Sequence, residues 1–240
     1  MSPEWLAGAG IIAVASFVFG LTGFGIGLVA LSLLPFLMPP ATAVPLVTAY
    51  ATVFTLAMLI QLRRDVALRR VADLLIGTVV GTPIGVWVLA TFPAGILKRL
   101  IGLVLIGSVV AELRGLYPQA LAGRGWGLGA GLLSGLLGGA VGMPGPPVIL
   151  YVAAQGWSPR TMKAALQAFF FLNQSVILGG YWWAGLLTRE VAWFAVSFAV
   201  PAVAGVAAGM NLFDRVDHAR FRRIVFALLF VLGLVLLVRG

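Results

Sequence analysis

The sequence has no cysteine, one histidine and seven acidic residues among 240. Without cysteine, disulfides, thiolate metal sites and cysteine redox chemistry are excluded. No HExxH motif or His/Asp/Glu cluster with metal-ligand spacing is present, and the lone histidine, His218, lies in a basic connection away from any nucleophile. A membrane-embedded enzyme is thereby disfavoured. We expect a protein that is not an enzyme and binds no metal or other cofactor.

Charged residues are also scarce, at 10%, whereas 61% of the chain is hydrophobic and the mean hydropathy is +1.09. A soluble chain could not bury that much apolar surface, so we expect an all-α integral membrane protein with the lipid bilayer around it. The net charge is +9, but the basic residues are spread over short connections between apolar runs. This distribution is typical of cytoplasmic loops, and we expect no nucleic-acid partner. The N-terminal run lacks a basic n-region and a convincing cleavage site, so we interpret it as mature sequence.

Glycine and proline interrupt two of the apolar runs. Residues 135–148 read GLLGGAVGMPGPPV, and residues 20–27 read GLTGFGIG. Proline removes backbone donors and glycine permits unusual backbone, so we predict uncoiled segments at both places. Such interruptions in corresponding positions of two halves indicate a transporter's binding site. Close helix packing through small residues is the alternative explanation.

The apolar runs predict the membrane segments. Residues 5–36 are broken into pieces of about 16 and 10 residues, neither of which comfortably crosses ~30 Å of hydrocarbon. Residues 126–154 form the second broken run. On the run 71–92, three glycines at four-residue spacing predict a close helix contact. The remaining runs, each long enough to cross, are 41–62, 71–92, 96–113, 161–185, 191–212 and 221–238.

The chain contains an internal duplication. An offset of 124 maps Gly81 onto Gly205 and Gly85 onto Gly209, and it maps Lys98-Arg99-Leu100 onto Arg222-Arg223-Ile224. We therefore predict one membrane domain made of two repeats, each with one broken helix and three transmembrane helices. The first repeat is 1–114, the connecting loop is 115–125 and the second repeat is 126–240.

The positive charges predict that the repeats are inverted. If both broken helices cross, the 16 basic residues divide eight and eight between the two sides; if both re-enter, they divide twelve and four. The positive-inside rule favours the second arrangement, with the twelve-charge side cytoplasmic and both termini outside. The four basic residues on the other side are Lys98, Arg99, Arg189 and Arg239.

The runs GLTGFGIGLV from Gly20 and SGLLGGAVGMPGPP from Ser134, together with the duplication, resemble the TauE/SafE anion permease family. The resemblance covers nearly the whole chain. It implies a bacterial inner-membrane secondary transporter, often an exporter, for small sulfur-containing anions such as sulfite, sulfoacetate or related organosulfonates. Ile26 and Met143-Pro144 stand where family members often carry additional glycines.

The predicted site lies at the broken-helix ends. A helix that starts after a break presents unpaired N–H groups with a partial positive charge, which bind anions. We expect two such helix starts, near 24–27 and 145–148, to hold one oxyanion at mid-membrane. Amides on the run 161–185 and hydroxyls on 41–62 are added as ligands, although bonds between or within helices would also explain them. The predicted substrate-binding residues are Gly23, Phe24, Gly25, Gly27, Gly142, Met143, Pro144, Gly145, Pro146, Asn173, Gln174, Gln167, Thr48 and Thr52.

The sequence is compatible with several functions. No acidic or basic residue lies unambiguously at mid-membrane, so coupling through a buried carboxylate is poorly supported. An anion transporter is favoured; an anion channel, an uptake permease for another small organic anion and a structural subunit are the alternatives. The sequence leaves open which anion is moved, the direction, the coupling and whether the protein forms a homodimer.

Overall fold

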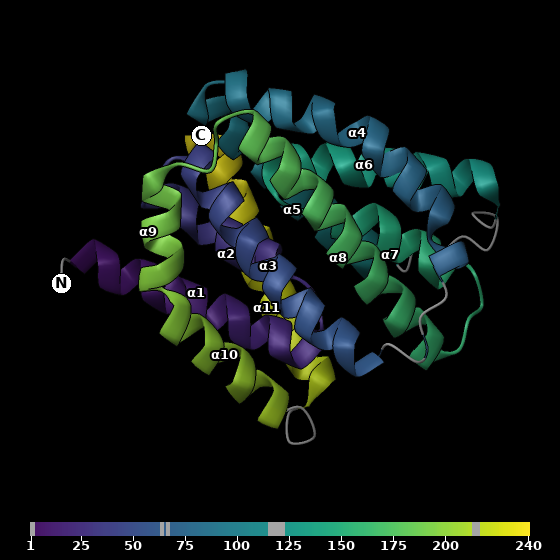
Figure 1. Ribbon diagram of the computed structural model, residues 1–240. Helices are drawn as coiled ribbons and strands as arrows, with labels where there is room; N and C mark the ends of the chain where they lie inside the picture. Colours follow the sequence, from purple (N-terminus) through teal and green to yellow (C-terminus); the bar gives the residue numbers. More distant parts are fainter. Residues whose placement is uncertain (1–2, 63–64, 66–67, 115–122, 213–216) are drawn as a thin grey trace. The chain divides into compact units, whose positions relative to one another are not determined.

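The computed structural model describes residues 3–62, 65, 68–114, 123–212 and 217–240, and every regular element within them is a helix (Figure 1). The predicted connection 115–125 lies outside the described residues except for its last three. The helices are α1 (Pro3–Thr22), α2 (Ile26–Leu33), η1 (Leu34–Phe36), α3 (Pro40–Leu62), η3 (Leu68–Arg70), α4 (Ala72–Thr91), α5 (Ala94–Leu113), α6 (Arg124–Val141), α7 (Gly145–Ala153), α8 (Pro159–Trp183), α9 (Arg189–Ser197), α10 (Ala199–Leu212) and α11 (His218–Arg239).

The described helices have the lengths and composition of a multi-pass membrane protein. Four of them, α1, α3, α4 and α5, are long and apolar enough to cross a membrane, and α9 with α10 makes a fifth if that bent pair is one span. Each of the four has 20 residues or more, which gives about 30 Å at 1.5 Å per residue. The prediction of an all-helical membrane protein is confirmed.

Two predicted segments differ from the structure. The first piece of the broken N-terminal run is longer than expected: α1 has 20 residues and is long enough to cross, because it starts at Pro3 and stays helical through Gly20 to Thr22. The predicted straight span 191–212 is instead two helices with a 50° bend between them. Pro201 lies in the first turn of α10, where its ring would clash with the carbonyl of Ser197 in a continuous helix and its nitrogen donates no bond.

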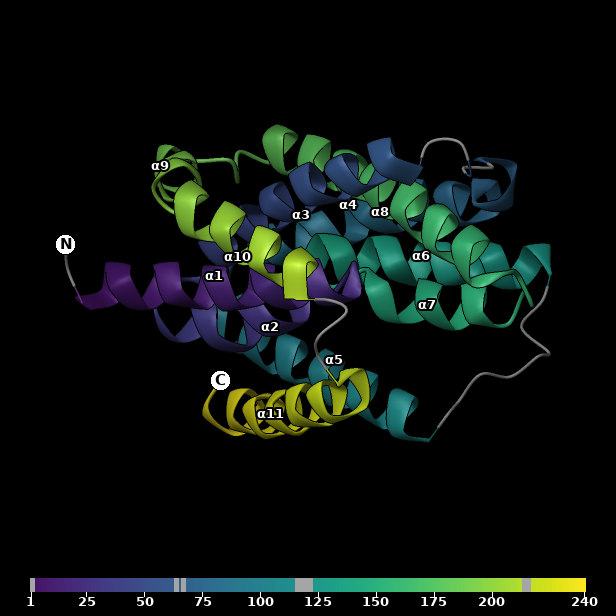
Figure 2. The same cartoon turned by 90° about the horizontal axis from the view of Figure 1, so that it is seen from below.

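The chain divides into two compact units, each of which combines parts of both halves of the sequence. The first contains Met1–Val47, Phe92–Leu113 and Leu187–Gly240, and the second contains Thr48–Thr91 and Arg114–Leu186. In the first unit, α1 packs along α10 and α5 packs along α11 (Figure 2). In the second unit, α4 packs along α6, and α8 packs against both (Figure 1).

Glycines bring α4 and α6 into backbone contact in the second unit. A Cβ at Gly81 would overlap the carbonyl oxygen of Leu132, and one at Gly85 would overlap that of Leu136. Gly131 in turn faces the carbonyl of Leu74. The predicted small-xxx-small contact on 71–92 is therefore confirmed.

The same glycine contact occurs in the first unit. Gly205 of α10 faces the Ala13 carbonyl of α1, and Gly209 faces that of Phe17. Gly205 and Gly209 are the positions 124 residues after Gly81 and Gly85, and the facing carbonyls also differ by a constant 119 positions (132 − 13 and 136 − 17). Thus α6, the first helix of the second broken run, packs on α4 from the first half of the sequence. In the other unit, α1, the first helix of the first broken run, packs on α10 from the second half.

Candidate functional site

The second break, between α6 and α7, has a well-defined local geometry. Gly142 ends α6 with φ of 68°, in the left-handed region that favours glycine. Its N–H donates to the Gly138 carbonyl at 3.0 Å, which is the bond of an αL helix cap, and the Met143 N–H donates to the Leu137 carbonyl at 3.3 Å. After Pro144, α7 starts and turns back along α6 (Figure 2). The predicted uncoiled segment is confirmed, and the re-starting helix begins at Gly145 as expected.

The first break, between α1 and α2, is built on a threonine. Gly23 and Gly25 have φ of 79° and 87°. The Thr22 hydroxyl lies 2.6 Å from the Phe24 carbonyl and 2.9 Å from the Val18 carbonyl, and it accepts a bond from the Phe24 N–H at 3.3 Å. This side chain holds the turn between the two helices. The predicted break near 20–27 is confirmed, with α2 starting at Ile26.

The two helix starts differ in how many backbone donors they offer. At α2, the first helical bond is made by the Val29 N–H to Gly25 at 3.2 Å, so the three preceding amides, 26–28, have no partner within the helix. At α7, the second and third residues are Pro146 and Pro147, which have no N–H. Gly145 therefore supplies the one N–H of the first three positions of α7. An anion at this end needs donors from side chains.

Ser134 holds the second break in place from within α6. Its hydroxyl is fully buried and donates to the Pro144 carbonyl at 2.6 Å. This bond ties the residue before α7 to the middle of α6. Ser134 was not among the predicted site residues, although it is the one hydroxyl on a helix that, apart from Arg124, contains glycine and apolar residues alone.

Tyr181 of α8 is a second residue at this break that was not among the predicted site residues. Its hydroxyl lies 3.0 Å from the Gly138 carbonyl and 2.9 Å from the Gly139 carbonyl, both in the last turn of α6, and the whole residue is buried. The Thr48 side chain also hydrogen-bonds this hydroxyl. Gly138 accepts from Gly142 as well, so Gly139 is the carbonyl for which Tyr181 matters most. Tyr181 thus fixes the end of α6 immediately before the break.

Replacement of Tyr181 by Phe should lower the free energy of unfolding by about 1–3 kcal/mol, because the buried Gly139 carbonyl loses this donor. Melting of the purified protein in detergent measures this effect. As a control, Ser108→Ala removes a hydroxyl that bonds its own helix at the Val104 carbonyl, and it should change stability by less than about 0.5 kcal/mol. Equal melting of Tyr181→Phe and the parent would show that the bond to α6 is not needed.

Asn173 of α8 lies at the second break. An ideal Cβ at Gly138 would be 3.7 Å from Asn173 Nδ2 and 3.1 Å from Pro144 Cβ, so the amide and the break face the same point of α6. Asn173 is fully buried, and neither its Nδ2 nor its Oδ1 has a hydrogen-bond partner in the described part of the chain. Buried amides are rarely left in this state, since each unpaired group costs about 1–3 kcal/mol. The geometry therefore leaves one donor and one acceptor open beside the broken helix.

Comparison with protein families agrees with this architecture. A family model described as sulfite exporter TauE/SafE matches residues 8–236. The chain belongs to the TauE/SafE family. Members are sulfite or anion exporter-type membrane transporters. Searches of curated proteins and of solved structures gave no significant match.

Two other predicted ligands in this TauE/SafE protein, Thr48 and Thr52, have partners of their own. Thr52 donates to the Thr48 carbonyl at 2.8 Å, a bond within α3 that favours a packing role. Thr48 is buried and is tied to Tyr181. On α8, Gln167 and Gln174 are buried at 2% and 7% exposure, on the same helix as Asn173. Their contact with substrate stays a prediction, as it does for the backbone positions of both breaks.

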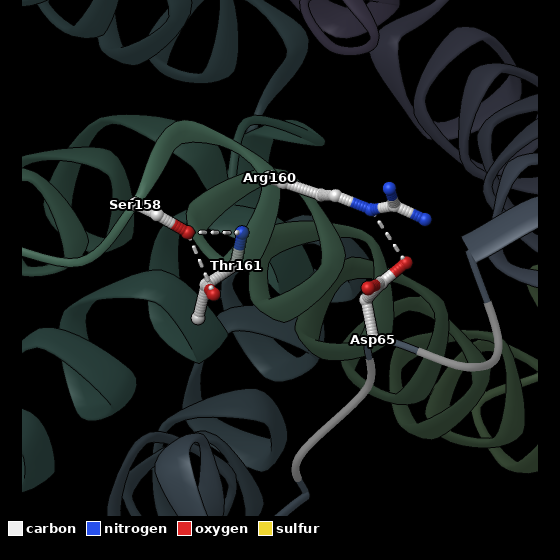
Figure 3. A network of polar contacts seen from close by, with 4 residues as sticks. All are labelled: Asp65, Ser158, Arg160 and Thr161. Atoms are coloured by element: carbon white, nitrogen blue, oxygen red, sulfur yellow. Dashed lines mark hydrogen bonds and ion pairs between the residues drawn. The ribbon is translucent and has the colours of Figure 1, made fainter.

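The ion pairs of the second unit lie away from this break. Arg160, at the start of α8, contacts Asp65 at 2.9 Å, and Ser158 caps the same helix by accepting from the Thr161 N–H at 3.3 Å (Figure 3). The Arg160 side chain is 75% exposed. Exposed pairs contribute little to stability, and here the guanidinium and the helix start already have partners. We therefore assign this cluster to loop anchoring and not to anion binding.

Proposed function

We propose that this chain is a secondary transporter, acting as an exporter, for small sulfur-containing anions such as sulfite or organosulfonates. The observation that carries the proposal is the open amide of Asn173 beside the start of α7. It supplies a neutral donor where Pro146 and Pro147 remove backbone donors, so an oxyanion gains hydrogen bonds without a buried positive charge. The backbone residues proposed to contact the anion here are Gly142, Met143, Pro144, Gly145 and Pro146.

The electrostatics of a helix start favour an anion over a cation. The N-terminus of α7 carries about half a positive charge, and the field acts strongly within the first turn. The membrane potential then favours export of an anion, by about 2.3 kcal/mol per charge for each 100 mV. Export in this scheme requires no buried carboxylate or proton site.

We propose an inverted repeat with re-entrant broken helices, located in the bacterial inner membrane. Two features support it. α2 and α7 have 8 and 9 residues, about 12–14 Å of helix, and each turns back on the helix before it. α1 by itself is long enough to cross the membrane. Re-entry in the first repeat therefore requires that α2 turns back along α1. The expectation that Gly23, Phe24, Gly25 and Gly27 contribute to the same site stays a prediction.

Counter-transport in liposomes tests the proposed function. Vesicles containing the purified protein are loaded with labelled 2-hydroxyethanesulfonate, and efflux is followed with and without unlabelled 2-hydroxyethanesulfonate outside. A carrier should release label faster when external substrate is present, whereas a channel should not. Absence of flux for sulfite, 2-hydroxyethanesulfonate and thiosulfate alike, in vesicles whose protein is folded, would contradict the proposal.

A further inference from the structure

Asn173 leaves two different hydrogen-bonding groups open, and the anion discussed above uses one of them. Nδ2 donates, and the oxygens of a sulfite or sulfonate group accept. Oδ1 only accepts, so a second group with an N–H or O–H must face it. Both atoms are inaccessible to solvent and unpartnered within the described ranges. A ligand made of acceptors alone would therefore satisfy one side of the amide and leave the other unmet.

The described groups that meet Asn173 at Gly138 do not supply the missing donor. The groups that approach Gly138 beside it are the Cδ1 methyl of Ile177 and the Cβ of Pro144, which are apolar. The nearby Tyr181 hydroxyl is directed at the carbonyls of Gly138 and Gly139. The Ser134 hydroxyl is directed at Pro144. These two hydroxyls are thus engaged elsewhere, and the Gly145 N–H is the donor that is proposed above to face the anion.

We infer that Asn173 selects anions that carry a hydrogen-bond donor as well as acceptor oxygens. This inference rests on the proposed transport function and specifies its substrate class. Hydrogensulfite, with an acidic hydrogen, and sulfonates with a hydroxyl or amino group meet the condition; the sulfite dianion and alkanesulfonates do not. An anion of acceptors alone also brings its negative oxygens toward the partial negative charge on Oδ1, which disfavours it further.

Two monoanions of nearly equal shape test the inference. 2-Hydroxyethanesulfonate and 1-propanesulfonate differ by a hydroxyl in place of a methyl group. Affinities for the full-length protein are measured from the shift in melting temperature with anion concentration. The parent should bind the hydroxyl compound roughly tenfold more tightly, the factor expected for one hydrogen bond. Asn173→Leu, which has similar volume and no polar atoms, should bind both compounds equally.

A control variant shows whether the preference depends on Asn173 itself, and the parent protein shows whether the preference exists. Ser175→Ala removes an α8 hydroxyl that bonds the Phe171 carbonyl at 2.8 Å, and this variant should keep the tenfold preference. Asn173→Ala gives the same comparison as Asn173→Leu if the latter does not fold. Equal affinities in the parent, or a preference that survives loss of the Asn173 amide, would overturn the inference while leaving anion transport intact. If no sulfur anion stabilises the parent, the proposed function fails and the inference fails with it.

Discussion

Replacement of Gly145 by Leu is expected to abolish anion binding while the protein remains folded. Gly145 is the first residue of α7 and supplies the one N–H in its first three positions. A Cβ at this position would lie 3.5 Å from Ile149 Cδ1 and 3.9 Å from Phe170 Cζ, which are ordinary contacts. The site thus tolerates a small side chain, whereas a larger one extends into the region where the anion is proposed to bind.

The loss can be measured as a missing thermal shift. At a 2-hydroxyethanesulfonate concentration 100-fold above its dissociation constant, the parent should gain about 2.7 kcal/mol of stability, and Gly145→Leu should gain none. Gly145→Ala is the matched control, because its methyl group meets only ordinary contacts; it should keep most of the shift. A Gly145→Leu protein that is stabilised like the parent would remove the start of α7 from the binding site.

Replacement of Gly81 by Ala should destabilise the protein by about 1–3 kcal/mol, the usual cost of forcing extra atoms into a packed interface. The added Cβ would overlap the Leu132 carbonyl oxygen, which is backbone and cannot rotate away. α4 and α6 must therefore move apart along their contact. A lower melting temperature in detergent, and a larger fraction of aggregated protein, are the expected observations.

Two further glycines make this test specific. Gly129, also on α6, has no atom within 4 Å of its Cβ position, so Gly129→Ala should be neutral or stabilising by up to about 1 kcal/mol. Gly205→Ala should be as damaging as Gly81→Ala, because Gly205 faces the Ala13 carbonyl in the equivalent contact. If Gly81→Ala and Gly129→Ala melt at the same temperature, the close α4–α6 contact does not stabilise the protein.

The sequence predicts the helices and the breaks because both depend on local chemistry. The bounds of α3, α4 and α5 follow from where apolar runs end at charges or turn residues, whereas α11 starts three residues before the predicted run 221–238. Both breaks follow from clustered glycine, and Gly23 and Gly142 indeed have positive φ. Proline alone is a weaker guide. Pro45 and Pro83 lie inside continuous helices, whereas Pro201 follows a bend of 50°.

The parts of the site that the sequence did not reveal depend on contacts between distant residues. Tyr181 bonds carbonyls 42 and 43 positions earlier, and nothing local to its sequence indicates that partner. Ser134 bonds Pro144 ten positions later, across the turn from α6 to α7. Asn173 was predicted from its polarity in an apolar run, but its open donor and acceptor emerge only from the packing of α8 against α6.

Substrate protection of single cysteines tests whether the broken-helix ends of this protein bind a small anion. The chain has no native cysteine, so Phe24→Cys, Gly145→Cys and the control Gly129→Cys each carry one thiol. The rate of maleimide labelling is measured with and without 2-hydroxyethanesulfonate. Labelling should be slower at positions 24 and 145 in its presence and unchanged at position 129. Unchanged rates at both breaks, under conditions in which 2-hydroxyethanesulfonate is transported, would contradict anion binding at these helix ends.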